Sequence, residues 1–293
     1  MHKGAPMFRS TAYSFEGAVI MATQTEIDEL FRQTLEGDYD DEDDEGGPWE
    51  AVSKLQAIAS DEDEGRAIFD KAVQWARNNK PAKRRRGVDI LAQLGKTEDH
   101  PDVVFANESY KVVTGVLEDE LDPQVIDSCL VALGHLGNPS AVPLILEHRK
   151  NTDPDIRFAV AFALSCFADE PDAIRVLLEL MEDSDPDIRD WATFGLGVQG
   201  SADTPEIREA LLERLDDGNP DTREEAVAGL GKRKDLRVLP DLIELLQQEE
   251  VSYGVVEAAC HLLDLPEINE EWSADDYIEA LSTRYAAELE RYT

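Results

Sequence analysis

Apolar residues recur along residues 142–246 with the spacing of one helical face. The stripes are Val142/Ile145/Leu146, Ile174/Leu177/Leu178, Ile207/Ala210/Leu211 and Leu239/Leu242/Ile243, and their starts lie 32, 33 and 32 residues apart. A spacing of i, i+3 and i+4 places three side chains on the same side of an α-helix. The sequence therefore predicts a helix of one design about every 32 residues.

Another predicted helix precedes each stripe and begins at a proline. An Asp or Asn before a proline favours a helix start, because the side chain caps the helix and proline fits its first position. A leucine follows each proline by ten residues, directly after a small residue, which lets neighbouring helices approach closely. The prolines are Pro123, Pro154, Pro186 and Pro220, at intervals of 31, 32 and 34 residues, and the leucines are Leu133, Leu164, Leu196 and Leu230.

A repeat of this length is typical of a solenoid, in which each repeat buries its apolar face against its neighbours. We therefore expect an all-α solenoid over residues 49–293, built from about six to seven helix pairs. Outside the four clearest repeats, the predicted pairs are Trp49–Ala59 with Glu64–Asn78, Lys83–Leu94 with Asp102–Leu117, and Val251–Leu263 with Ser273–Tyr292. Ser273 and Asp276 predict a capping box at the start of the last helix.

The N-terminal region does not follow the repeat. Residues 1–22 are expected to be an extension, disordered or a mis-assigned start, with Met21 as the alternative first residue. A short helix is predicted over 23–36 and a disordered linker over 37–48, because residues 38–45 hold seven carboxylates in eight positions. A calcium-binding loop starting at Asp41 is disfavoured, since its twelfth position is Val52 and a bidentate glutamate is required there.

Charge and cysteine content restrict the class of binding partner and the cellular compartment that the sequence predicts. The net charge is −36, from 64 acidic and 28 basic residues, which disfavours nucleic acid and anionic membranes and favours basic partners or a salt-rich habitat. No apolar run reaches the roughly 20 residues of a membrane span. Cys129, Cys166 and Cys260 are distant from one another and expected to be buried thiols, so a cytoplasmic location is predicted.

The repeat resembles the HEAT family, in the short bacterial form found in phycobilisome lyases. The resemblance is carried by Asp153–Arg157 with Ala159 and Ala161–Leu164, and by Leu133–Pro143. It implies a right-handed α-α superhelix, with the first helices on the convex side and the second helices on the concave side. It leaves activity open, because the family includes scaffolds, chromophore lyases, metal-dependent hydroxylases and DNA glycosylases.

The residues disfavour two of these activities. Hydroxylases of the family bind iron through His-Glu motifs, and none of the five histidines here is followed by Glu. The glycosylases need a basic groove, whereas this chain has a single basic cluster: Lys80, Lys83, Arg84, Arg85 and Arg86. We interpret it as a local patch that contacts the acidic run 38–45, with an anionic ligand or nucleic acid as the alternative. No catalytic residue, metal or cofactor is predicted, and Gly195-Leu196-Gly197 and Gly229-Leu230-Gly231 are interpreted as helix C-caps.

Departures from the repeat are the candidates for binding. Trp191 occupies a variable column, either as a recognition anchor or as a residue that fills the space between repeats. The Asp–Arg series, with Arg157, Arg189 and Arg223, is expected to be a structural ladder between repeats. The second helices also present an acidic strip opposite their apolar stripe, and uniform charge of this kind favours a basic protein or peptide. Its members are Glu147, His148, Glu179, Glu182, Glu206, Glu209, Glu213, Asp241 and Glu244.

These observations predict a non-enzymatic scaffold or adaptor that holds a basic protein segment on its concave surface. The alternative is a lyase or chaperone that attaches a bilin or another prosthetic group to a partner protein. The sequence leaves the oligomeric state and the identity of the partner open.

Overall fold

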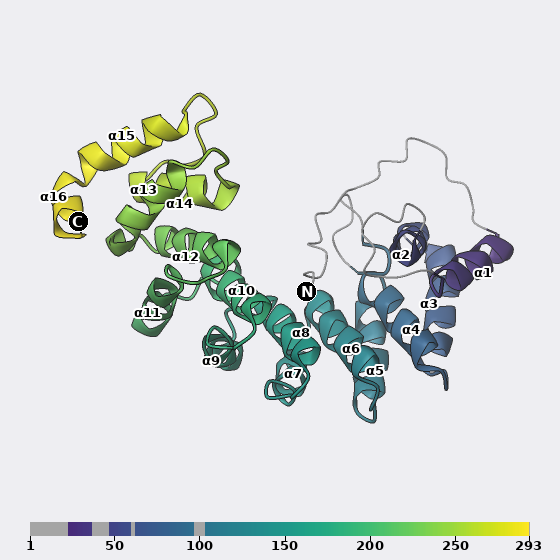
Figure 1. Ribbon diagram of the computed structural model, residues 1–293. Coiled ribbons are helices and arrows are strands. Elements are labelled where there is room, and N and C mark those ends of the chain that lie inside the picture. The colour runs from purple at the N-terminus through teal and green to yellow at the C-terminus, as the bar shows by residue number, and fades with distance from the viewer. Residues whose placement is uncertain (1–22, 37–46, 60–61, 97–102, 293) are drawn as a thin grey trace. The chain divides into compact units, whose positions relative to one another are not determined.

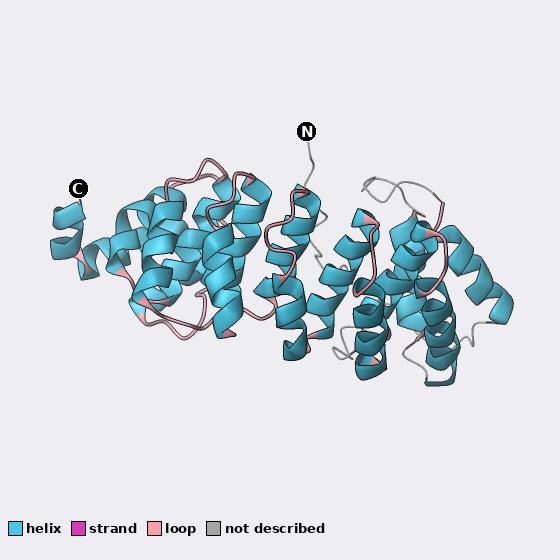
Figure 2. Ribbon diagram, turned by 90° about the horizontal axis from the view of Figure 1, so that it is seen from below, coloured by secondary structure: helices cyan, strands magenta, loops and turns pink. Residues whose placement is uncertain are grey.

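The computed structural model describes residues 23–36, 47–59, 62–96 and 103–292. The regular structure in these ranges is helical, without a strand (Figure 2). The prediction of an all-α solenoid is therefore confirmed. The predicted extension over residues 1–22 and most of the predicted linker lie outside the described residues.

The chain divides into an N-terminal unit, residues 1–141, and a C-terminal unit, residues 142–293. In the N-terminal unit α4 packs against α3 and α6, and α5 packs against α6. Its helices are α1 (Gln24–Gln33), α2 (Pro48–Ile58), α3 (Glu62–Ala76), α4 (Pro81–Ala92), α5 (Ala106–Leu117), α6 (Pro123–Leu136) and the 3₁₀ turn η1 (Pro139–Ala141).

In the C-terminal unit the first helices of successive repeats pack side by side, and α7, α9 and α11 lie on one side of that row (Figure 1). Its elements are α7 (Val142–Leu146), α8 (Pro154–Ser165), α9 (Pro171–Leu180), α10 (Pro186–Phe194), the π-helical turn η2 (Gly195–Gln199), α11 (Pro205–Arg214), α12 (Pro220–Lys232), the 3₁₀ turn η3 (Leu236–Val238), α13 (Leu239–Leu246), α14 (Tyr253–Leu263), α15 (Ala274–Arg284) and α16 (Ala286–Tyr292).

The predicted starts of the four helices that begin at Pro123, Pro154, Pro186 and Pro220 are confirmed. Asp153, Asp185 and Asn219 accept hydrogen bonds from backbone N–H groups two residues on, at 3.0–3.1 Å. The same geometry recurs at Asp122, which accepts from Gln124 N at 3.2 Å. These side chains satisfy donors that have no partner inside the helix.

The Asp–Arg series is a ladder between repeats at Arg157 and Arg189, as predicted, whereas Arg223 donates to the carbonyl of Asp217 in the turn before its own helix. Arg157 donates from Nε and Nη2 to the carboxylate of Asp183, at 2.8 and 3.1 Å. Arg189 makes the same bidentate contact with Asp217, at 2.8 and 2.9 Å. Planar, charge-assisted pairs of this type fix both distance and orientation. Each repeat is thereby attached to the turn that opens the next one.

The interpretation of the Gly-Leu-Gly segments as C-caps holds only for Gly195, which caps α10 with φ −54° and leads directly into the π-helical turn. It was wrong for the second segment, because Gly229 and Gly231 lie inside α12. A Cβ atom on Gly229 would lie 2.6 Å from the Cα of Gly197. Gly197 and Gly229 are required because the backbones of η2 and α12 touch.

The repeat from Pro186 to Pro220 is longer than its neighbours, and the π-helical turn lies within it. Arg233, only 8% exposed, donates to the carbonyl oxygens of Leu196 at 2.6 Å, Gly197 at 3.1 Å and Ala202 at 3.1 Å. A π-helical turn interrupts the regular backbone bonding of an α-helix. The buried guanidinium supplies the partners that these carbonyls need.

Three local predictions were also wrong. The helix predicted over Ser273–Tyr292 has the expected capping box but divides at Tyr285, whose hydroxyl donates to Leu262 O at 2.5 Å. The helix predicted from Asp102 begins at Ala106, because Phe105 adopts a left-handed conformation with φ 59°. Cys129 and Cys260 are buried as expected, but Cys166 is exposed at the end of α8.

The close contact of η2 with α12 predicts opposite effects for two glycine substitutions. Gly229→Ala should destabilise the protein by about 3 kcal/mol, because the added methyl group meets a backbone atom that cannot yield. Gly115→Ala is the matched control: its Cβ would have open space, so the better helix former should stabilise by about 0.8 kcal/mol. Urea unfolding followed by circular dichroism measures both. Equal effects of the two variants would contradict the packing role of Gly229.

The ladder makes a separate prediction. Arg189→Met should cost about 3 kcal/mol, since it leaves Asp217, whose side chain is 4% exposed, without its main counter-ion. Arg175→Met removes a pair on the surface, where the arginine is 52% exposed, and should cost less than about 1 kcal/mol. The ladder has no structural role if both variants unfold at the same urea concentration.

Candidate binding face on the second helices

The predicted acidic strip lies on the second helices of the C-terminal unit. Glu147, Glu179, Glu182, Glu206, Glu209, Glu213 and Glu244 are exposed, whereas His148 and Asp241 are partly buried. They are presented outward because the apolar stripes of the same helices face the core: Ile145, Leu177, Leu211 and Leu242 are completely buried. The nine side chains therefore belong to the second helices α7, α9, α11 and α13 and to the turns that follow them.

Arginines neutralise part of the strip. Glu179 pairs with Arg175 at 3.3 Å, Glu182 with Arg214 at 3.2 Å, and Glu209 with Arg237 at 2.7 Å. The free negative charge is therefore smaller than the sequence indicates.

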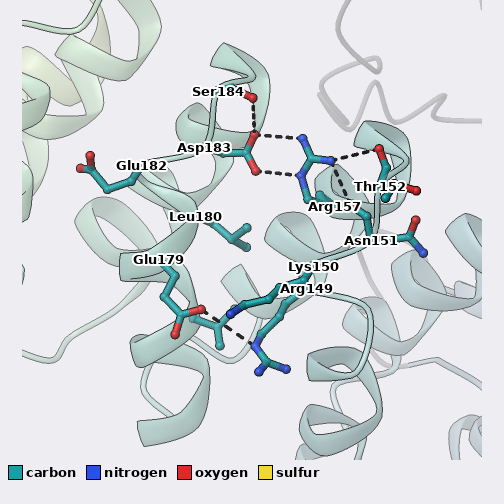
Figure 3. A pocket seen from close by; sticks show the side chains of 11 residues that line it. Arg149, Lys150, Asn151, Thr152, Arg157, Glu179, Leu180, Glu182, Asp183 and Ser184 are labelled. Atoms are coloured by element: carbon teal, nitrogen blue, oxygen red, sulfur yellow. Dashed lines mark hydrogen bonds and ion pairs between the residues drawn. The ribbon is translucent and has the colours of Figure 1, made fainter.

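A pocket of about 500 Å³ opens between the turn after α7 and helix α9 (Figure 3). Val176 and Leu180 supply its apolar lining. Figure 3 shows Arg157 directed at Asp183, while Arg149 lies 3.9 Å from Glu179. This first pocket carries charges of both signs.

A second pocket, of about 340 Å³, has the equivalent position two repeats later. Glu244 and Leu245 follow Glu179 and Leu180 by 65 residues. The pocket is lined by Leu215, Asp216, Asp217, Arg223, Val227, Asp241, Glu244 and Leu245. Arg214 links the second helices α9 and α11 between the two pockets. It belongs to α11 and donates to the carbonyl oxygen of Met181, the residue that follows α9, at 2.5 Å.

Carboxylates dominate the second pocket. Burial raises the pKa of Asp241, and the nearby Asp216 and Glu244 raise it further. Asp217 differs, because its hydrogen bond with Arg189 lowers its pKa to about 2. Asp216, Asp241 and Glu244 therefore form a set of acidic groups that repel one another around an apolar floor.

Sequence reasoning did not identify Asp216, which lies in a turn outside the helical stripe. It stands 65 residues after Asn151, so a polar amide in the first pocket is a carboxylate in the second. An alignment of the turns, in addition to the helices, would have revealed this exchange.

Trp191 lies apart from the acidic strip. It belongs to α10, and its ring is 4.9 Å from that of Phe162, 5.4 Å from that of Phe194 and 6.1 Å from that of Phe158. Edge-to-face contacts of this kind are typical of aromatic packing. The geometry favours the role of filling the space between α8 and α10.

The basic cluster of the N-terminal unit is largely engaged within the protein. Arg84 makes a bidentate pair with Glu120, at 2.6 and 2.8 Å. Arg86 donates to Thr34 O at 2.8 Å and to Asp89 at 3.0 Å. The Lys83 ammonium lies 4.6 Å from the centre of the Trp75 ring, and Lys80 is exposed. The predicted contact of this cluster with residues 38–45 falls outside the described residues.

Metal-binding clusters and membrane-spanning helices are both absent from the described residues. No group of three or more His, Cys, Asp or Glu side chains has an arrangement that could hold a metal ion. No described helix combines the length and the apolar character that a membrane span requires.

A family model for HEAT repeats matches residues 110–197 and 174–264, which together exceed half of the chain. The chain belongs to the HEAT-repeat family. The predicted membership is thus confirmed for this HEAT-repeat protein, and no curated protein matches it.

Solved structures agree with the fold. YibA of Escherichia coli is 25% identical, with a TM-score of 0.60 over 87% of this chain and 92% of its own. The CpcE–CpcF complex of phycocyanin lyase from Nostoc is 16% identical, with a TM-score of 0.49 over 92% and 98%. A designed armadillo repeat protein in complex with the peptide (KR)4 is 14% identical, with a TM-score of 0.45 over 70% and 98%.

The second pocket predicts a change in titration. Glu244→Gln should lower the pKa of Asp241, because one of the negative charges that oppose its ionisation is removed. Carboxyl carbon NMR in a pH titration measures this shift. Glu147→Gln, in the turn after α7, is the control and should leave the pKa of Asp241 unchanged. An Asp241 pKa that is insensitive to Glu244→Gln would contradict the described arrangement.

Proposed function

We propose that this HEAT-repeat protein is a scaffold that holds a basic, extended segment of a partner protein on the second helices of its C-terminal unit. The observation that carries the proposal is the recurrence of one pocket two repeats apart, with a glutamate and a leucine at the same places. A recurring pocket on a repeat protein suits a chain that runs along the repeats.

The second pocket matches the chemistry of a lysine or arginine side chain. Its floor contains Val227 and Leu245, which can cover an aliphatic stem, and Asp241 and Glu244 can meet the charged head. The first pocket has Glu179 and Leu180 at the places of Glu244 and Leu245, but Val176 stands where the second pocket has Asp241. Because Arg149 and Lys150 also line the first pocket, we expect it to bind a cation more weakly.

The distance between the pockets sets the length of the segment. Neighbouring packed helices lie about 8–10 Å apart, so two repeats correspond to roughly 16–20 Å. An extended chain covers about 3.3 Å per residue, so the two pockets accept basic residues about five or six positions apart.

The negative charge of the protein helps to attract the basic segment from solution as well as to hold it in the pockets. The net charge of −36 attracts a basic segment from solution, and salt screens this attraction over about 10 Å at 0.1 M. The proposal needs neither a cofactor nor a catalytic residue. The cytoplasmic location predicted from the cysteine pattern forms part of this proposal.

A labelled peptide tests it directly. A 12-residue glycine–serine peptide with two arginines six positions apart should bind, and Glu244→Lys should weaken binding about tenfold at 50 mM salt, because it reverses a charge in the more acidic pocket. Glu179→Lys should have a smaller effect. Fluorescence anisotropy gives both affinities, and raising the salt to 500 mM should abolish binding.

Two controls separate local recognition from general attraction. Glu257→Lys makes the same change of charge on α14, at an exposed position of a first helix, and should change the affinity less than twofold. A peptide with adjacent arginines should bind more weakly than the spaced peptide. If Glu257→Lys weakens binding as much as Glu244→Lys, the pockets are not the binding site.

A further inference from the structure

The interface between α10 and α12 is lined by carboxyl groups where the preceding interface is aromatic. Four residues after its proline, α8 carries Phe158 and α10 carries Asp190. Five residues after its proline, α10 carries Trp191 and α12 carries Glu225. Trp191 packs on Phe158 and Phe162 of α8, whereas one repeat later the equivalent places hold two acids.

Both acids are largely enclosed. The hydroxyl of Thr222, a completely buried residue of α12, donates to Asp190 Oδ1 at 3.0 Å across the interface. Glu225 Oε2 is buried and has no hydrogen-bond partner. A buried carboxylate oxygen without a donor opposes ionisation, so the enclosure of Oε2 favours the neutral carboxyl group.

The charged groups around Asp190 and Glu225 do not stabilise the ionised forms of these two acids. Asp187 of α10, Asp221 and Glu224 of α12, and Asp217 in the turn before α12 all act on the pair with negative charge. The arginines of the two helices are engaged elsewhere: Arg189 binds the carboxylate of Asp217, and Arg223 donates to its carbonyl at 2.7 Å. The π-helical turn contributes backbone, since Gly197 lies against the Glu225 carbonyl and Gly229.

We propose that the α10–α12 interface is a pH-sensitive joint, closed while Glu225 and Asp190 are protonated and loosened as they ionise. Glycine backbones form one part of this contact and the carboxyl pair forms another. Ionisation would place two negative charges in this enclosed contact, next to apolar side chains such as Leu196 and Ala226 that cannot stabilise them.

The direction of the effect follows from the titration. Burial is the main cause that raises the pKa of Asp190 to about 6 and that of Glu225 to about 10. A raised carboxyl pKa stabilises the closed state fully below the ordinary value of the group, and this stabilisation is lost as the pH rises through the raised value. Between pH 6 and 9, opening releases about one proton, so its equilibrium constant rises about tenfold per pH unit.

The joint lies between the elements that carry the two pockets, α7 and α9 on one side and α13 on the other. Opening would change the separation of the pockets. This consequence rests on the proposed function, whereas the joint itself does not.

Hydrogen exchange on the full chain tests the joint. After correction for the intrinsic exchange rate, the opening equilibrium constant measured at the amides of α12 should rise about tenfold per pH unit between pH 6 and 9. The amides of α8 serve as the internal reference. Glu225→Gln should remove this excess, because the amide cannot ionise. Equal pH dependence in α8 and α12, or the same excess in Glu225→Gln as in the unmodified protein, would overturn the proposal.

Two further measurements keep the test decisive if Glu225→Gln does not fold. Carboxyl carbon NMR of the unmodified protein should show Glu225 titrating well above pH 7, and a titration near pH 4.5 would overturn the joint. Asp190→Asn should remove the additional dependence between pH 4.5 and 6, while the control Glu224→Gln should retain it. These outcomes are independent of peptide binding, so loss of the proposed function would leave them unchanged.

Discussion

The bidentate pair between an arginine of one first helix and the carboxylate in the next turn is the contact on which the arrangement of the repeats depends. Arg157 with Asp183, and Arg189 with Asp217, each join two repeats at a largely buried position. Each of these arginines also donates to a carbonyl of the turn before its own helix, at 3.0 and 2.9 Å. One side chain thereby fixes the start of its helix, the turn before it and the repeat after it. The ladder sets the register of one repeat against the next, and the apolar stripes stack in that register.

The repeat also explains why the same pocket recurs. Arg157 and Arg223 line the two pockets three residues after their prolines, and each donates to a carbonyl of the turn before its own helix. The pockets differ in the turn, where Asn151 is exchanged for Asp216, and in the second helix, where Val176 is exchanged for Asp241. Function on this scaffold therefore depends on small changes around a conserved geometry, as expected for proteins whose regular residues are committed to stacking.

The sequence predicted most of the fold because its determinants are local. Caps at Asp153 and Asp185, the apolar stripes and the ladder arginines depend on spacings within one or two repeats, and periodicity reveals them. Other features depend on contacts between segments that no short pattern records. The sequence could not show that Gly229 touches Gly197, that Arg233 binds three carbonyls around η2, or that Glu120 is the partner of Arg84. The acidic strip was located correctly by periodicity, but its partial neutralisation by Arg214 and Arg237 depends on how helices from different repeats lie together.

The central claim is that the two equivalent pockets of the second helices are where a basic segment binds. The most direct measurement is methyl NMR of the protein titrated with the spaced-arginine peptide. The account predicts that the largest shifts fall on Leu180, Val227 and Leu245, which line the pockets, with no comparable change at Val160 and Leu164 in the core of α8. Shifts confined to other faces, or their absence at peptide concentrations that saturate binding, would contradict it.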